Sequence, residues 1–443
     1  MNGRIFFWSL TSALAGFLFG FDTVVISGAE KTIQALWGLS PGMHGIAMAS
    51  ALYGTVVGSL IGGWPADRFG RKATLLWIGV LYFVGAVGSA LASNVSIFIA
   101  ARVVGGLGIG ISTVVAPMYI SEIAPPKHRG RLAGMFQFNI VLGILIAFVS
   151  NRLLADVGEN AWRWMLGVAA FPSVLYALFC MGLPESPRWL ISRKGDRPSA
   201  VQILRRIQPD ISESEIEAEA DEIAAASTGQ GSSGHFWTRR LSKPILLAIL
   251  IAFFNQLSGI NVILYFAPRI FELAGLEAKT ALLQSIGIGV TNFIFTFVGL
   301  WLIDRLGRRT LLYIGSFGYI ASLGLAALAF TTRHYSIVPE CIFAFIAAHA
   351  IGQGAVIWVF ISEIFPNRHR AEGQALGSFT HWIFAALLTT VAPKVFATFP
   401  TGSIFAFFAG MMVLQLIWVK AMVPETKGVP LEEIQKRLGS EMA

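Results

Sequence analysis

Two ionisable residues interrupt long apolar stretches of the sequence. Asp22 lies in the first of these stretches, and Arg102 lies in the fourth. A charged side chain inside a membrane-spanning segment is costly, so it is a functional candidate by default and needs a partner. Both residues lie about seven residues from the same predicted membrane surface, which at 1.5 Å per helical residue places them at a similar depth. We therefore expect Asp22 and Arg102 to form an ion pair.

A carboxylate beside a guanidinium group in this setting is a candidate proton switch. Burial favours the neutral carboxyl group, whereas a nearby Arg favours the ionised carboxylate. Protonation of Asp22 would release Arg102 and allow the fourth helix to shift, which would couple proton binding to a conformational change. A purely structural buried ion pair is the alternative interpretation.

The composition indicates that most of the chain lies in lipid. Hydrophobic residues make up 55% of the 443 residues and charged residues 13%, with a mean hydropathy of +0.67. Soluble domains carry about 25% charged residues, so a soluble globular protein, a disordered chain and a nucleic-acid-binding protein are excluded. Runs of about 20 apolar residues predict membrane-spanning helices. We expect twelve, over residues 5–29, 43–64, 73–92, 95–118, 131–153, 162–183, 244–270, 279–303, 310–331, 337–362, 372–394 and 401–423.

The basic residues predict the orientation of these helices. Most of the 33 Lys and Arg residues fall in the loops on one side, which the positive-inside rule makes cytoplasmic together with both termini. The basic isoelectric point of about 9.6 follows from this topology and requires no acidic macromolecular partner. Cys180 and Cys341 lie in apolar stretches, and we expect neither a disulfide nor a metal role for them.

Three charged motifs recur about 240 residues apart. The segment Asp67–Lys72 returns as Asp304–Arg309, Ser121–Pro125 returns as Ser362–Pro366, and Pro184–Ser186 returns as Pro424–Thr426. We therefore expect two six-helix halves over residues 1–183 and 244–423, joined by a cytoplasmic segment with short helices over 184–243 and followed by a tail over 424–443. Two such parallel repeats are typical of secondary transporters that bind substrate between the halves.

The recurring motifs also bring acidic and basic residues to one membrane surface. Single ion pairs there contribute little stability, but they favour one of two packings when the other packing breaks them. Positive-inside topology alone would explain the Arg residues but not the carboxylates repeated in each half. The candidate residues of this cytoplasmic gate are Asp67, Arg68, Arg71, Glu122, Arg129, Glu185, Arg188, Asp304, Arg305, Arg308, Glu363, Arg370 and Glu425.

These motifs resemble the major facilitator superfamily and, within it, the sugar porter family. The resemblance covers nearly the whole chain and includes Pro184–Leu190, Asn255–Asn261 and Pro424–Gly428. The segment Gly20–Gly28 is similar to the first helix of bacterial proton-coupled pentose and hexose symporters. The resemblance implies the major facilitator fold and favours proton coupling, because proton-driven members have Asp at the position of Asp22 whereas facilitative uniporters typically have an amide.

The resemblance also implies a monosaccharide site. Amide side chains both donate and accept hydrogen bonds, and aromatic faces pack on sugar rings. On an unbroken helix Gln256 points about 140° away from Asn261, so we expect local unwinding at Ser258 and Gly259 to bring them together. Positions that match sugar contacts in the family are Gln137, Gln256, Asn261, Tyr265, Asn292, Trp358 and Trp382. For each alone, a contact between packed helices is the alternative.

Two residues depart from the family pattern. Asn255 stands where a Gln is usual, and His381 stands where Gln or Asn is usual. Both residues therefore belong to the candidate substrate site. We expect the selectivity for ring hydroxyl groups to differ from that of better-known relatives. A neutral imidazole that replaces an amide is the simpler interpretation of His381, and a second proton site is the alternative.

The expected function is proton-coupled symport of a hexose or pentose by alternating access. A facilitative sugar uniporter is the nearest alternative, and a sugar-sensing transporter homologue is disfavoured by the short tail after Val423. An enzyme is not expected, because the sequence has no phosphate-binding Gly-x4-Gly-Lys motif, metal cluster or placed nucleophile. We expect a multi-pass protein of a bacterial inner membrane that acts as a monomer, uses the proton as coupling ion without another cofactor, and binds no nucleic acid.

Overall fold

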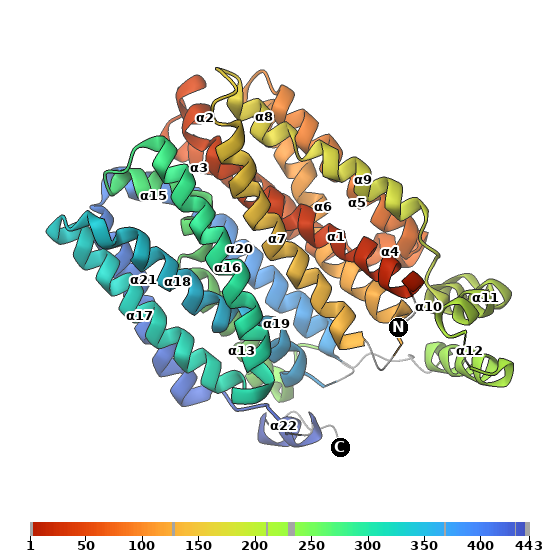
Figure 1. Cartoon of the computed structure of the whole chain (residues 1–443). Coiled ribbons are helices and arrows are strands. Elements are labelled where there is room, and N and C mark those ends of the chain that lie inside the picture. Colours follow the sequence, from red (N-terminus) through yellow and green to blue (C-terminus); the bar gives the residue numbers. More distant parts are fainter. Residues whose placement is uncertain are drawn as a thin grey trace. The chain divides into compact units, whose positions relative to one another are not determined.

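The chain folds into membrane-spanning helices. The computed structural model describes residues 3–125, 129–209, 211–228, 235–366, 369–429 and 431–438, and all regular secondary structure within them is helical. Twelve helical segments in these ranges are long and apolar enough to cross a membrane (Figure 1). Each overlaps one predicted span, with ends that differ by a few residues. The predicted fold class is therefore confirmed.

The spanning segments are formed by fifteen α-helices, because three segments are divided in two. The undivided helices are α1 (Gly3–Val25), α3 (Pro41–Ile61), α5 (Arg71–Leu91), α6 (Val95–Ile123), α7 (Arg129–Leu154), α16 (Ala278–Leu306), α17 (Arg308–Thr332), α20 (Arg370–Thr398) and α21 (Thr401–Met422). The divided segments are α8 with α9 (Ala161–Gly167, Ala170–Met181), α13 with α14 (Ser242–Leu257, Ile260–Tyr265) and α18 with α19 (Val338–Ile351, Gln353–Ile364).

Short helices connect or extend these segments. They are η1 (Ile26–Gly28), α2 (Glu30–Leu36), α4 (Gly63–Phe69), α10 (Pro187–Trp189), η3 (Leu190–Lys194), α11 (Arg197–Ile207), α12 (Glu213–Thr228), η4 (Arg239–Leu241), α15 (Ala267–Leu273), η5 (Tyr335–Ile337) and α22 (Leu431–Leu438).

The chain forms two compact units, and we describe each by itself. The first comprises Met1–Thr23, Tyr53–Ile144 and Leu166–Gly234. Within it α5 packs against α6 and α9 (Figure 1). A Cβ atom on Gly85 of α5 would lie 2.6 Å from the Cα atom of Gly105 of α6. Glycines thus allow the backbones of these two helices to approach closely, which is typical of helix packing in membranes.

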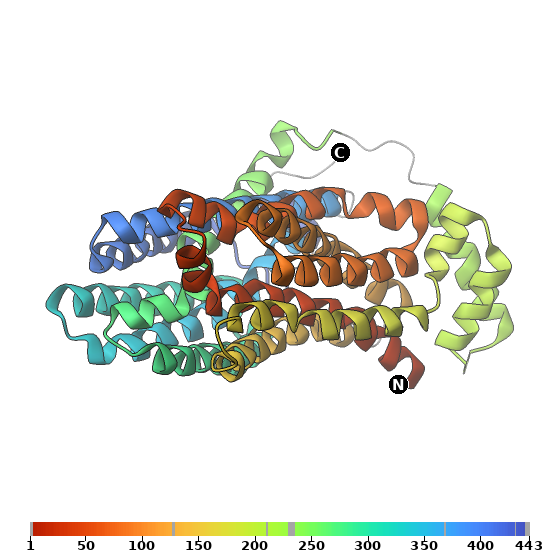
Figure 2. The same ribbon diagram turned by 90° about the horizontal axis from the view of Figure 1, so that it is seen from above.

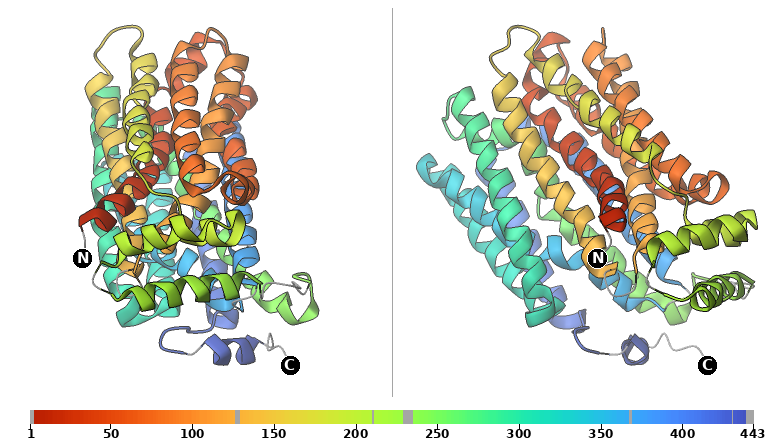
Figure 3. Two further views of the ribbon diagram at one scale, coloured as in Figure 1. Left: turned by 90° about the vertical axis from the view of Figure 1, so that its right-hand side faces the viewer. Right: turned by 45° about the vertical axis from the view of Figure 1, so that its right-hand side comes forward.

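Short helices occupy part of the connection predicted over 184–243. In the first unit, α11 and α12 lie across one end of the long helices (Figures 2 and 3). Their facing sides form a small apolar core, in which Val201 and Leu204 of α11 pack with Ile216 and Ala220 of α12. Asp196 caps α11 by accepting a hydrogen bond from the backbone N–H of Ser199. The predicted short helices are therefore present.

The second unit comprises Val24–Leu52, Leu145–Met165 and His235–Ala443. Within it α17 packs against α18 and α21, and α13 packs against α20. Buried polar groups of α17, α19 and α21 form a chain of hydrogen bonds: Gln353 donates to Gln415 at 2.9 Å, and Gln415 donates to the Ser316 hydroxyl at 2.8 Å. Such networks hold helices together where water is absent.

Large apolar side chains remain exposed on the spanning helices. Trp77 of α5, Phe171 of α9 and Phe317 of α17 are 61%, 70% and 61% exposed, respectively. In water such surfaces would drive aggregation, whereas in a bilayer they contact lipid chains. The exposed surface therefore agrees with a multi-pass membrane protein.

Candidate functional site

The two charges predicted to pair inside the membrane are in contact within the first unit. Nη1 of Arg102 on α6 lies 2.7 Å from Oδ1 of Asp22 on α1, and its Nη2 donates to the Asp22 backbone carbonyl at 3.3 Å. Asp22 is 7% exposed and Arg102 2%. The Asp22 Oδ2 atom is also buried and has no hydrogen-bond partner among the described residues. Arg102 therefore binds one oxygen of the carboxylate, and the other oxygen remains able to accept a proton.

Close helix packing fixes the position of this pair. A Cβ atom on Gly20 of α1 would lie 1.9 Å from the backbone carbonyl oxygen of Ile140 on α7, and one on Gly143 would lie 2.2 Å from that of Phe17. Because α1 and α7 approach at glycines on both sides, neither helix can slide freely past the other. Asp22 therefore lies on a segment that is rigidly placed within its unit.

The predicted break in the seventh spanning segment is present in the second unit. Helix α13 ends at Leu257, Gly259 has φ of +87°, and α14 begins at Ile260. A left-handed backbone at this point suits glycine and disfavours other residues. A Cβ atom there would also lie 2.8 Å from the ring of Phe408. The sequence places glycine where both the backbone and its neighbour require it.

The break brings the polar residues of this segment together. Asn261 donates through Nδ2 to Oε1 of Gln256 at 2.8 Å, across the interruption, and Gln256 Nε2 donates to Oδ1 of Asn255 at 3.0 Å. The same Nε2 lies 3.1 Å from Nε2 of His381 on α20. All three amide side chains are buried. Because the Gln256 oxygen faces Asn261, its N–H group faces the ring of His381, whose two nitrogens lie 3.1 and 3.2 Å from it.

Aromatic rings surround the His381 end of this chain of hydrogen bonds. The ring centroid of His381 lies 5.2 Å from that of Trp358 on α19 and 4.7 Å from that of Trp382 on α20. Trp358 is held in turn by Gln374, whose Nε2 donates to the Trp358 backbone carbonyl at 2.9 Å. Tyr265, at the end of α14, is buried. Amides beside aromatic faces are the chemistry expected for a polyhydroxylated ring.

Two further predicted substrate residues are Asn292 and Gln137. Asn292 of α16 accepts from the Thr296 hydroxyl group at 3.5 Å, one turn along its own helix. Gln137 lies half-buried on α7 in the first unit, whereas the other predicted substrate residues lie in the second. The structure thus brings together Asn255, Gln256, Asn261, Trp358, His381 and Trp382.

The predicted gate residues form a network inside the first unit. Arg71 at the start of α5 binds Glu122 at the end of α6, with Nε–Oε2 at 2.9 Å and Nη2–Oε1 at 3.0 Å. Its Nη1 donates to Asp67 at 3.2 Å, and Arg193 binds the other Asp67 oxygen at 2.8 Å. Glu185 accepts the backbone N–H of Arg71 at 2.9 Å. Burial raises the pKa of Glu185, and backbone N–H groups oppose that shift.

The same network recurs inside the second unit. Arg308 binds Glu363 at 2.7 Å and Asp304 at 3.1 Å, and its backbone N–H donates to Glu425 at 2.9 Å. The turn before each Arg is also repeated, since Gly70 and Gly307 have φ of +94° and +92°. A side chain at either glycine would meet the carboxylate that caps the next helix, Glu185 or Glu425. The repeated charged motifs therefore have the same local structure in both units.

The remaining predicted gate residues lie around these two networks. Arg68 lies 6.0 Å from the ring centroid of Phe69, and Arg305 lies 3.8 Å from that of Trp301. Arg370 donates to the Ser362 backbone carbonyl at 2.9 Å. Helix α7 begins at Arg129, whose side chain lies outside the described residues.

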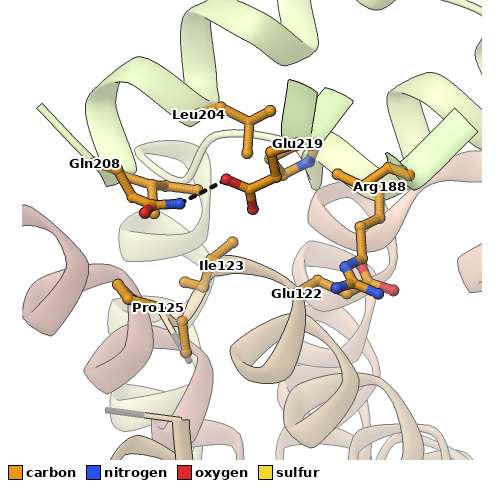
Figure 4. Close-up of a pocket in the computed structure, with 11 residues that line it drawn as sticks. Glu122, Ile123, Pro125, Arg188, Leu204, Gln208 and Glu219 are labelled. Carbon is orange, nitrogen blue, oxygen red and sulfur yellow. Dashed lines mark hydrogen bonds between the residues drawn. The ribbon is translucent and has the colours of Figure 1, made fainter. Parts of the chain in front are cut away.

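A small pocket lies where the connecting helices cover the end of α6. Arg188 and Glu122 line one side of it, and Leu204 and Gln208 line the other (Figure 4). Gln208 donates to Glu219 at 2.7 Å across the pocket rim. The connecting helices thus contact the segment that carries Glu122.

The sequence did not single out a further cluster in the second unit. Glu30 of α2 contacts His44 of α3 and Arg269 of α15, and Lys31 forms an ion pair with Glu272. In the sequence, Lys31 and Arg269 lie at the ends of apolar stretches. That position indicated charged residues near the membrane surface, and it did not indicate that they form ion pairs.

Comparison with known proteins identifies the family. The family model described as sugar (and other) transporter matches residues 8–438. The chain belongs to the sugar transporter family. Among curated relatives of this sugar transporter, the arabinose-proton symporter of Bacillus subtilis is 35% identical over 98% of this chain and 95% of its own. The D-xylose-proton symporter of Escherichia coli K12 is 33% identical over 98% of this chain and 96% of its own.

Solved structures of related transporters share the fold of this sugar transporter. The xylose transporter of Escherichia coli in an inward open conformation has a TM-score of 0.86 and 31% identity, covering 98% of this chain and 99% of that chain. A proton:xylose symporter bound to 6-bromo-6-deoxy-D-glucose has a TM-score of 0.80 and 31% identity, covering 99% and 100%. The protein therefore has the major facilitator fold.

Proposed function

We propose that this sugar transporter is a proton-coupled symporter of a monosaccharide, a hexose or a pentose, that works by alternating access. The observation that carries the proposal is the buried contact between Asp22 and Arg102, with Nη1 at 2.7 Å from Oδ1. Proton coupling needs a group inside the membrane whose charge can change, and a carboxylate is such a group. Relatives named as proton symporters for arabinose, xylose and galactose support the same assignment.

Protonation of Asp22 is the proposed coupling step. The proton adds to a carboxylate oxygen and removes the negative charge that binds the Arg102 guanidinium group. A buried ion pair that loses one charge leaves the other unpaired, at a cost of about 3–5 kcal/mol. Rearrangement of α6, which carries Arg102, relieves that cost. Proton binding thereby favours the conformational change that carries the sugar.

The proposed sugar site is built around the break between α13 and α14. Gln256 and Asn261 supply amide groups to ring hydroxyls, Trp358 and Trp382 supply apolar faces, and Asn255 and His381 alter selectivity. Amides buried in a chain of hydrogen bonds are already oriented for a ligand, which reduces the entropy lost on binding. Gln137, Tyr265 and Asn292 are further proposed sugar contacts, on the family resemblance.

The repeated charge networks are proposed to form the cytoplasmic gate. Each network binds the end of one spanning helix to the start of another within the same repeat, so each repeat moves as a stiff body at that surface. The excess of Arg and Lys there supports a cytoplasmic location for this surface and for both termini. We further propose a bacterial inner membrane location and a monomeric transporter that needs no cofactor besides the coupling proton.

Uptake into proteoliposomes with an imposed proton gradient tests the proposal. A competition panel of hexoses, pentoses and polyols first identifies the sugar. The native protein is expected to accumulate that labelled sugar above equilibrium, and Asp22→Asn is expected to lose accumulation while sugar exchange continues. Equilibration that ignores the gradient would instead show a facilitative uniporter.

A further inference from the structure

A buried charge cluster joins the two sequence repeats at the end opposite the repeated motifs. Glu30 of α2 is 1% exposed, and its carboxylate contacts His44 and Arg269. Arg269 of α15 binds it with two parallel hydrogen bonds, Nε–Oε1 and Nη2–Oε2, both 2.8 Å long. Nε2 of His44 on α3 lies 2.8 Å from the same carboxylate. This fork geometry is the strongest form of ion pair that a carboxylate makes.

The cluster lies in closely packed surroundings. His44 has no exposed surface, and its ring centroid lies 6.3 Å from that of Phe266. The residue after it, Gly45, packs on α20 so closely that a Cβ atom would lie 1.8 Å from the Thr390 carbonyl oxygen. Burial of this kind makes an ion pair costly to form and costly to break. A surface pair would have neither property.

Solvent reaches the cluster through Arg269. Arg269 and Gln34 line an open pocket of about 450 Å³, and Gln34 also accepts from Nη2 of Arg269 at 2.6 Å. The Arg269 side chain is 18% exposed, whereas that of Glu30 is 1% exposed. Separation of the elements would therefore admit water first to Arg269 and then to Glu30, so the separated charges would be hydrated.

The members of the cluster come from different repeats. Glu30 and His44 belong to the first repeat, residues 1–183, and Arg269 belongs to the second. Alternating access, on which this inference rests, requires contacts between the repeats at one membrane surface to break when the site opens to that surface. By the proposed topology this surface is external.

We propose that Glu30, Arg269 and His44 form an external latch, which is intact when the sugar site is closed to the outside and broken when it opens. Within its unit the latch lies at the opposite end from the Arg308 network, and it sets the balance between the two conformations rather than binding sugar. Arg269 is a positioning residue in this scheme, because it acts through α15, which follows α14 and the sugar-binding break directly.

Distance measurements between two spin labels test the latch. The labels are placed on Leu36→Cys of α2, which is 53% exposed, and on exposed Glu277→Cys before α16, in a background where Cys180 and Cys341 are replaced by Ala. Loss of a buried charge pair shifts a two-state equilibrium strongly. Glu30→Gln is therefore expected to raise the ratio of long to short distances between the two labels by at least about tenfold. Lys31→Gln is the matched control. It breaks an ion pair between the same two helices whose Lys side chain is 51% exposed, and the ratio is expected to stay unchanged.

Two further variants keep the result decisive. Arg269→Lys keeps the charge but cannot make the two parallel hydrogen bonds, so it is expected to raise the ratio less than Glu30→Gln. The exchange Glu30→Arg with Arg269→Glu is expected to restore part of the native ratio. Native distances in folded Glu30→Gln and Arg269→Lys proteins would overturn the latch. Since the measurement needs neither sugar nor a proton gradient, it fails independently of the proposed transport activity.

Discussion

The glycine at the break of the sugar site makes a quantitative prediction possible. Gly259→Ala adds a Cβ atom to a residue with φ of +87°, and that atom would lie 2.8 Å from the Phe408 ring. Left-handed backbone costs a non-glycine residue about 1–2 kcal/mol, and overpacking adds about 1–3 kcal/mol. The two costs either lower stability or are relieved by moving α14, which carries Asn261 away from Gln256.

A matched glycine separates the two costs. Gly275 has φ of +84°, but a Cβ atom there would meet nothing within 4 Å, so Gly275→Ala carries the backbone cost alone. We expect Gly259→Ala to lower the melting temperature in detergent more than Gly275→Ala does. We also expect it to weaken sugar binding by about tenfold, which corresponds to about 1.4 kcal/mol.

The double variant Gly259→Ala with Phe408→Ala removes the ring that the new methyl group meets. It is expected to regain part of the lost sugar affinity, although loss of the ring itself reduces stability. Calorimetric titration with the sugar identified by competition measures the affinities. If Gly259→Ala and Gly275→Ala have the same melting temperature and affinity, the reasoning from the Phe408 contact is wrong.

Two other predictions concern the charge networks and the histidine of the sugar site. Arg71→Lys and Arg308→Lys each lose a forked contact to a partly buried carboxylate, and each is expected to lower the free energy of unfolding by about 1.5–3 kcal/mol. Arg205→Lys, in an exposed ion pair, is expected to lower it by less than about 1 kcal/mol. Equal losses in all three variants, measured by thermal or denaturant unfolding, would contradict the importance of burial. His381→Gln keeps a hydrogen-bond acceptor for Gln256. The pH profile of sugar uptake is therefore expected to stay unchanged, while the selectivity among sugars changes. A shifted pH profile would show that His381 exchanges protons.

Much of the fold could be predicted from local patterns in the sequence. Apolar runs of membrane length predict the spanning helices, because lipid requires each backbone group to bond within its own segment. The contact between Asp22 and Arg102 follows from their equal depth. The break at Ser258 and Gly259 follows from the need to bring Gln256 and Asn261 to one side. Each of these inferences uses only local geometry and the thickness of the membrane.

Other features depend on contacts that local patterns do not encode. Glu30 and Arg269 lie 239 residues apart in the chain, and their contact depends on how the ends of α2 and α15 pack. The motifs predicted a gate but not that Arg71 binds Glu122 within the same repeat. The interruption between α18 and α19 at Gly352 was also unpredicted, and so was the close approach of this glycine to α17, where a Cβ atom on Gly352 would lie 2.8 Å from the Cα atom of Gly315.

Proton movement driven by sugar tests the central claim most directly. The native protein is reconstituted into weakly buffered proteoliposomes without a pH gradient, with the membrane potential clamped at zero, and the transported sugar is added outside. Symport through Asp22 predicts that the external pH rises on sugar addition as protons enter with the sugar, and that Asp22→Asn abolishes the rise. An external pH that stays constant while labelled sugar enters through the native protein would contradict proton coupling.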